Sequence, residues 1–301
     1  MKTRTKLTAF AAVLAVTFGG ALAVGAAVGP IDVGDGTSHT VHTPTDTTGM
    51  DRPRGLAISE AGYRLVLEAD TVGAGAALPF AFQIVDDKGM PVTRFVELHE
   101  RQLHLIVFSR NLVDYLHLHP GMDANGRWTV ELPALEPGSY RVFADFQPVG
   151  GDNLTLGADI TIPGDGEAGQ LPRPSEVSTI DEYIVSLSGT PRVGDTELGL
   201  TVELDGELVQ TDPYLGAAGH LVAIRIGDLA FLHVHPNETD SSSVIAFTSQ
   251  FPSAGTYRLF FDFSHNSQVR TAAFTVVVPA ATDGPHDTMT MNSASLDEEG
   301  N

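Results

Sequence analysis

Two short segments of the chain carry paired histidines at the same spacing. The first is YLHLHP at residues 115–120, and the second is FLHVHP at residues 231–236. Side chains two residues apart on a strand point to the same face, so each pair would present two imidazole rings together. Imidazole nitrogen is a common ligand of Zn(II) and Cu(II). The two segments are therefore candidate parts of metal sites.

The paired histidines belong to a longer internal repeat. Residues 104–120, HLIVFSRNLVDYLHLHP, align without a gap on residues 220–236, HLVAIRIGDLAFLHVHP, and residues 137–146, PGSYRVFADF, match residues 253–263, SAGTYRLFFDF. A histidine begins each copy, and an aspartate follows the last histidine by 26 residues in the first copy and 27 in the second. The repetition predicts two related domains in tandem, each carrying the same chemical groups.

Each copy predicts a hairpin that brings its histidines together. A turn centred between Arg110 and Asn111 sets His104 directly opposite His117, and the same arithmetic in the second copy centres the turn on Ile226–Gly227. Directly opposed residues on antiparallel strands have Cβ atoms about 4.5–5.5 Å apart. In an immunoglobulin-like sheet, strand F runs antiparallel to strand C, which places the aspartate at the end of F beside the first histidine.

We therefore expect one site for Cu or Zn in each repeat, built from three imidazoles and a carboxylate. The aspartate is either a fourth ligand or an acceptor that fixes the tautomer of one ring. A metal-free alternative is a buried His–Asp hydrogen-bond network that braces the sandwich. The predicted ligands are His104, His117, His119 and Asp145 in the first repeat, and His220, His233, His235 and Asp262 in the second.

Two further histidines are weaker candidates. His99 faces Leu215 in the gapless match, so we interpret it as an ordinary strand or loop residue. His265 follows Asp262 by three residues and faces Pro148, and it would at most extend the second site.

The elements that position these groups are predicted to be short strands. Apolar or alternating runs of four to eight residues are separated by turn signals such as DDKG, DANG and EPGS. Each repeat also has a Gly-x-Tyr sequence where immunoglobulin-like sandwiches have a tyrosine corner, at Tyr140 and Tyr257. Trp128 has no counterpart in the second repeat and is interpreted as a core residue. The fold class is all-β, with two tandem immunoglobulin-like β-sandwich domains behind an N-terminal signal or anchor segment.

The remaining segments predict an exported protein. A basic start, MKTRTK, precedes a long apolar run with a small-x-small cleavage signal at residues 21–23, so the leader is cleaved there or kept as an anchor. The chain has no cysteine and a formal charge of −21, which disfavours binding to nucleic acid. We expect a leader or anchor at residues 1–29, a spacer at 30–52, sandwiches at 53–163 and 177–279, a linker at 164–176 and a disordered tail at 280–301.

The two repeated segments, HLIVFSRNLVDYLHLHP and PYLGAAGHLVAIRIGDLAFLHVHP at residues 213–236, resemble those of a family of exported bacterial proteins, often actinobacterial. That family carries loosely assigned heavy-metal-binding or copper-associated roles. The resemblance covers roughly residues 55–278 and implies export and tandem β domains more firmly than a particular metal.

The favoured function is an extracytoplasmic metal-binding protein that buffers, carries or detoxifies copper or zinc. Its expected partners are the metal ion and an envelope protein that donates or accepts it, and any membrane contact would be through an uncleaved leader. The alternative is a non-catalytic envelope scaffold whose His–Asp clusters are structural. We do not predict an enzyme, because no GxSxG, P-loop, CxxC or HExxH motif occurs and no second carboxylate near the clusters is shared by both repeats.

Overall fold

The structure is a computed structural model, and it describes residues 53–73, 78–166, 169–237 and 243–280. The predicted leader, spacer and almost all of the predicted tail lie outside these residues, as do the side chains of His233, His235 and Pro236. All regular elements among the described residues are β-strands, which confirms the all-β prediction. No helix in the described part is long and apolar enough to cross a membrane.

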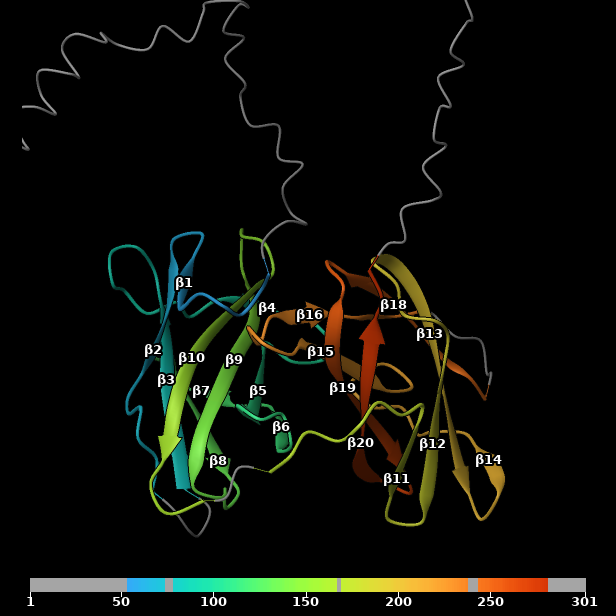
Figure 1. Ribbon diagram of the computed structural model, residues 1–301. Helices are drawn as coiled ribbons and strands as arrows, with labels where there is room; N and C mark the ends of the chain where they lie inside the picture. The colour runs from blue at the N-terminus through green and yellow to red at the C-terminus, as the bar shows by residue number, and fades with distance from the viewer. Residues whose placement is uncertain (1–52, 74–77, 167–168, 238–242, 281–301) are drawn as a thin grey trace, which may run out of the picture. The chain divides into compact units, whose positions relative to one another are not determined.

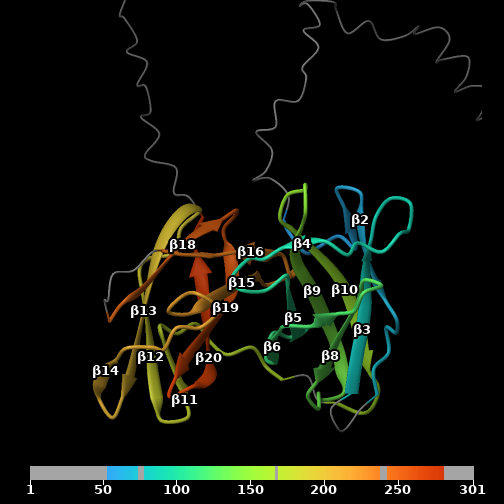
Figure 2. The same cartoon turned by 180° about the vertical axis from the view of Figure 1, so that it is seen from behind.

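The first repeat consists of two sheets that enclose a core. One sheet has the strand order β1-β2-β3-β8-β7, and the other has the order β10-β9-β5-β6, with β4 paired to β9. In this repeat β9 and β10 are nearest the viewer in Figure 1, and β3 is nearest in the reverse view of Figure 2. The strands are β1 Ser59–Glu60, β2 Tyr63–Leu67, β3 Leu78–Val85, β4 Phe95–Val96, β5 Leu103–Ser109, β6 Tyr115–Leu118, β7 Gly121–Met122, β8 Arg127–Leu132, β9 Gly138–Pro148 and β10 Leu154–Ile162.

The second repeat has the same arrangement. One sheet has the order β11-β12-β13-β18-β17, with β14 paired to β13, and the other has the order β16-β15-β19-β20. The tandem sandwiches predicted from the sequence are therefore confirmed. The strands are β11 Val177–Ile180, β12 Tyr183–Ser188, β13 Gly194–Leu204, β14 Glu207–Val209, β15 His220–Arg225, β16 Phe231–His233, β17 His235–Pro236, β18 Ile245–Phe251, β19 Gly255–His265 and β20 Gln268–Val278.

Each sandwich has its own apolar core. Trp128 is 2% exposed and packs in the core of the first repeat, as expected, with Phe82 and Phe95 beside its ring. In the second repeat, alternate residues of β13 such as Leu198 and Leu200 point into the corresponding core. The alternation of buried and exposed residues along β13 is what the period of a strand with one buried face requires.

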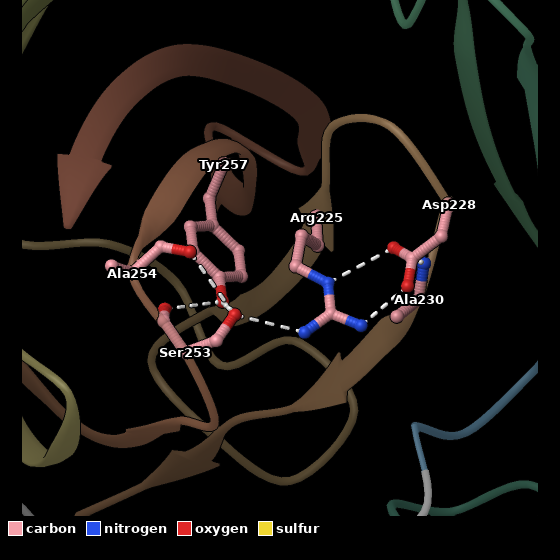
Figure 3. A network of polar contacts seen from close by, with 6 residues as sticks. All are labelled: Arg225, Asp228, Ala230, Ser253, Ala254 and Tyr257. Carbon is pink, nitrogen blue, oxygen red and sulfur yellow. Dashed lines mark hydrogen bonds and ion pairs between the residues drawn. The ribbon is translucent and has the colours of Figure 1, made fainter. Parts of the chain in front are cut away.

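Both predicted tyrosine corners are present. The hydroxyl of Tyr140 donates to the carbonyl oxygen of Glu136 at 2.9 Å, and that of Tyr257 donates to the carbonyl oxygen of Ser253 at 2.8 Å. Figure 3 shows that the second corner is also tied to the β15–β16 hairpin, because Arg225 donates to both the hydroxyl of Ser253 and the carboxylate of Asp228. The corner therefore links the start of β19 to the strand that begins with His220.

Replacing Tyr257 with phenylalanine is expected to lower the free energy of unfolding by about 0.5–1.5 kcal/mol, because the ring stays buried while one hydrogen bond is lost. Urea denaturation of the two proteins measures this difference. Tyr140→Phe, at the same place in the first repeat, is the matched variant and should show a loss of similar size. Unchanged stability in both would contradict a stabilising role for the corners.

A third apolar cluster joins the two repeats. It contains Ile106, Phe108 and Phe143 from the first repeat together with Ile224 and Phe260 from the second. All described residues belong to one compact unit. Strands β5 and β9 of the first repeat, and β15 and β19 of the second, are therefore buried on both faces over most of their length.

The contacts between the repeats are reciprocal. Tyr115 of the first repeat stacks on Phe260 of the second, with ring centres 4.2 Å apart, and Phe231 of the second meets Phe143 of the first at 5.5 Å. Each hairpin thus packs on the long strand of the other repeat. This arrangement turns the histidine-bearing faces of the two repeats toward one another.

Candidate metal centre

The predicted register of the hairpins was wrong by two residues. His117 pairs with Ile106 rather than with His104, and His233 pairs with Val222 rather than with His220. The cause is the position of the four-residue loop, which spans 110–113 in the first repeat and 226–229 in the second and is closed in the first by a hydrogen bond from the Ser109 N–H to the Asp114 carbonyl oxygen. The turn centre consequently moves one residue toward the C-terminus, and His104 and His117 become diagonal neighbours on one face.

The diagonal position still brings three histidines together. His104, His117 and His119 each offer a ring nitrogen, and these three nitrogens lie within 4.8 Å of one another. The ring centres are 5.2, 5.0 and 4.8 Å apart. Imidazoles bound at about 2.0–2.1 Å to one tetrahedral ion have ring centres about 5 Å apart. We call these three residues the triad.

Hydrogen bonds determine which ring nitrogens of the triad carry protons. Nε2 of His104 lies 3.0 Å from the carbonyl oxygen of Leu98, and Nδ1 of His117 lies 2.8 Å from a carboxylate oxygen of Asp262. Carbonyl and carboxylate oxygens accept hydrogen bonds, so both of these nitrogens carry the proton. The opposite nitrogens, His104 Nδ1 and His117 Nε2, therefore present lone pairs when the rings are neutral.

These two lone pairs face each other, because His104 Nδ1 and His117 Nε2 are only 2.9 Å apart. Two acceptors at this separation need a cation between them, either a third ring proton or a metal ion. Nε2 of His119 is also buried, and it has no hydrogen-bond partner among the described residues. One ring nitrogen from each of the three histidines lies within 4.8 Å of the other two, as the ligands of a single ion would.

The carboxylate that supports the triad comes from the other repeat. Asp262, which is 1% exposed, accepts from His117 and also from the hydroxyls of Tyr115 at 3.1 Å and Thr271 at 2.6 Å. The sequence had assigned Asp145 to this triad. Asp145 pairs with His104 in the backbone ladder, and its carboxylate accepts from the Thr155 hydroxyl at 2.7 Å and the Asn153 amide at 3.4 Å.

The second predicted set is described only in part. His220 is 8% exposed, pairs with Asp262 in the backbone ladder, and has its Nε2 atom 3.1 Å from the carbonyl oxygen of Tyr214. The backbone of His233 belongs to β16, whereas that of His235 belongs to β17, which pairs with β18 in the opposite sheet. The sequence had led us to expect both positions on one strand, but they lie in two different strands. The side chains of His233 and His235 lie outside the described part of the structure.

His99 was missed by the sequence analysis. Its ring centre lies 5.1 Å from that of His220 and 6.1 Å from that of His104. It was set aside because the second repeat has Leu215 at this position. His99 and Leu215 adopt the same left-handed backbone conformation, with φ of 51° and 52°, and no pattern in the sequence predicts this. His265, by contrast, is hydrogen-bonded to the Tyr183 hydroxyl at 2.8 Å and does not belong to the triad.

Burial shifts the protonation of the cluster. The pKa of His104 is lowered to about 4, that of His119 to about 3 and that of His220 to about 4, in each case first by burial and then by the neighbouring His117. These three rings are therefore neutral at pH 7. Neutral imidazole is the form that binds metal ions.

The metal-free protein is expected to lose stability as the pH falls from about 7 to 5. Histidines of the unfolded chain take up protons near a pKa of about 6.5, whereas folded His104 and His220 do so only near 4. Over this range the unfolded state binds more protons than the folded state, so the free energy of unfolding decreases as the pH falls. Thermal denaturation with a chelator present measures this decline, and His220→Gln should make it shallower. A flat profile in the wild type would contradict the prediction.

The described residues define a protein of two tandem immunoglobulin-like β-sandwiches with histidines where the repeats meet. The DUF8832 domain, described as a domain of unknown function, matches residues 58–164 and again residues 178–280, and the chain belongs to this family. No curated protein matches the chain significantly.

Several solved structures are similar to the chain at low scores. A DUF4426 family protein from Pseudomonas aeruginosa PAO1 has a TM-score of 0.29 and 8% identity, covering 35% of this chain and 96% of its own. The Escherichia coli adhesin FdeC has a TM-score of 0.26 and 18% identity, covering 74% of this chain and 66% of its own. Trypsin-activated alpha-2-macroglobulin from Escherichia coli has a TM-score of 0.26 and 11% identity, covering 75% and 16%. Similarity at this level carries no argument about function.

Proposed function

We propose that this protein binds a copper or zinc ion at the triad and buffers, carries or detoxifies that metal outside the cytoplasm. The observation that carries the proposal is that the lone pairs of His104 Nδ1 and His117 Nε2 lie 2.9 Å apart. In addition, the buried Nε2 of His119 in the same triad has no hydrogen-bond partner in the described part of the chain. Three nitrogen ligands with one open position suit Zn(II) and Cu(II).

Asp262 supports this proposal from the second repeat. A carboxylate that accepts the other N–H of a ligating histidine fixes the tautomer of the ring and raises its basicity. His117 and Asp262 have this relation at 2.8 Å, and both side chains are buried. We therefore assign Asp262 the supporting role, which the sequence had left open beside direct ligation, as part of the proposal.

The cellular setting follows from the sequence and is part of the proposal. The apolar leader favours export, and the acidic surface, with a formal charge of −21, favours cations and disfavours nucleic acid. The physiological partner would be an envelope protein that delivers or receives the ion. We propose binding rather than catalysis.

The test is the metal content and stability of the purified full-length protein. Titration with Zn(II) or Cu(II) should reach at least one ion per chain, and bound metal should raise the melting temperature because the ion binds only the folded state. A chelator should reverse the shift. A second ion at His220, His233 and His235 stays a prediction, and a stoichiometry of two would support it.

The scaffold alternative has an observation of its own. Asp262 bridges His117 and Tyr115 across the repeats, so the network could serve only to hold them together. The same titration separates the two functions. No binding and no melting shift with either metal would favour the scaffold.

Replacing Asp262 with asparagine is expected to weaken metal binding by about 10–100-fold, the usual cost of losing such a supporting carboxylate. Asp145→Asn is the matched variant from the first repeat, where the carboxylate accepts from the Thr155 hydroxyl as that of Asp262 accepts from the Thr271 hydroxyl. Isothermal titration of both proteins with the same metal measures the difference. A larger loss for Asp145→Asn than for Asp262→Asn would contradict the assignment of the supporting carboxylate.

A further inference from the structure

A small cavity lies against His104 and His117 of the triad, and residues of both repeats form its walls. Its volume is about 40 Å³, and the polar residues that line it in the described part of the chain are His99, His104, His117, Asp145 and His220. A water molecule needs roughly 10–15 Å³ of such space. The cavity therefore has room for a ligand of one to a few heavy atoms and for nothing larger.

His220 lines the same cavity as His104 and His117. Its ring centre is 6.1 Å from that of His117 and 6.4 Å from that of His104. The rings within the triad are separated by no more than 5.2 Å. Among the described residues, His220 is also not one of the histidines whose ring nitrogens lie within 4.8 Å of one another.

The orientation of His220 gives it a defined chemical role. Its Nε2 atom faces the carbonyl oxygen of Tyr214 at 3.1 Å, so that nitrogen carries the proton. The remaining nitrogen, Nδ1, has a lone pair and can only accept a hydrogen bond while the ring is neutral. A hydrogen-bond acceptor in the wall of the cavity suits a ligand that itself carries a hydrogen atom, such as water.

Three histidine ligands leave one coordination position of a four-coordinate ion free. We propose that this position opens into the cavity and takes water or a small anion of two or three atoms, with His220 accepting a hydrogen bond from the water. The proposal rests on metal binding at the triad. With the fourth position open, ligands from solution can reach the bound ion. An ion held by four protein ligands would not be accessible in this way.

Azide titration of the full-length protein loaded with Cu(II) tests the proposal. Azide bound to copper produces a charge-transfer absorption band, and the wild type should show one that saturates at one azide per copper. His220→Phe fills the cavity and should weaken azide binding at least tenfold while copper affinity stays within threefold. His265→Phe, at a histidine remote from the triad, should leave both unchanged.

Two results would overturn the proposal. If wild-type copper protein shows no azide band, the fourth position is closed by a protein group. If His220→Phe loses copper affinity by tenfold or more, His220 is itself a ligand. Should His220→Phe fail to fold, the wild-type protein alone decides the matter, because a missing azide band overturns the proposal and a saturating band at one azide per copper supports it. Absence of copper binding in the wild type would instead reject the proposed function.

Discussion

Replacing His119 with alanine should weaken Zn(II) or Cu(II) binding by about 100-fold or more, because the loss of a ligand exceeds the 10–100-fold cost of losing a supporting residue. The stability of the metal-free protein should hardly change. Nε2 of His119 is buried without a hydrogen-bond partner in the described part of the chain, and a polar atom buried in this way costs about 1–3 kcal/mol. Its removal leaves no other group unpaired.

This variant separates the two candidate functions because they predict opposite results. If His119 were a structural residue, its truncation would destabilise the protein and leave the metal affinity unchanged. Isothermal titration gives the affinity, and urea denaturation with a chelator gives the stability. His265→Ala is the control, since that ring is bound to Tyr183 and is not part of the triad. A metal affinity for His119→Ala within threefold of the wild type would reject the triad as the binding site.

Replacing Phe260 with alanine should lower the free energy of unfolding by about 3–5 kcal/mol, as truncation of a buried aromatic residue does. Phe260 is 1% exposed and stacks on Tyr115 of the other repeat, so the cavity would form between the two sandwiches rather than inside one. Tyr115 is two residues from His117, and its hydroxyl donates to Asp262. The variant should therefore weaken metal binding as well.

Urea denaturation and metal titration of Phe260→Ala measure both effects. Val277→Ala on β20 is the control, because Val277 is 52% exposed and exposed substitutions usually change stability by less than about 0.5 kcal/mol. A loss below about 1 kcal/mol for Phe260→Ala would mean that the cluster joining the repeats contributes little in solution.

The fold was predictable because its signals are local. The turn sequences between short apolar runs, the Gly-x-Tyr sequences before Tyr140 and Tyr257, and the gapless repeat all describe one sandwich at a time. The tyrosine corners formed as expected because each needs only a carbonyl oxygen four residues earlier in the chain. Such short-range geometry depends little on the rest of the molecule.

The register of the hairpins was less predictable, because it depends on loop conformation. A symmetric turn was assumed around Arg110 and Asn111, whereas the structure has a four-residue loop with Leu112 in a left-handed conformation, at φ 58°. Leucine rarely adopts a left-handed backbone conformation, so a leucine in the sequence does not predict one. The error was harmless for the triad, since diagonal neighbours on one face of a sheet remain within reach of long side chains.

One available signal was not used. The runs HLIVFS and HLVAIR are apolar without alternation, which is typical of strands buried on both faces. Two such runs in equivalent positions indicate that the outer faces of the two sheets are also covered. This observation would have pointed to contact between the repeats before the structure was known.

The sequence by itself determined the class of fold, the tandem repeat and the three histidines that meet in the first repeat, because strand alternation and a short hairpin are enough to bring them together. Only the tertiary structure decided which carboxylate supports His117 and which other rings lie nearby. Asp262 follows His117 by 145 residues, and no local periodicity links positions so far apart. Their meeting depends on how two finished sandwiches pack, which is a property of whole faces rather than of any single segment.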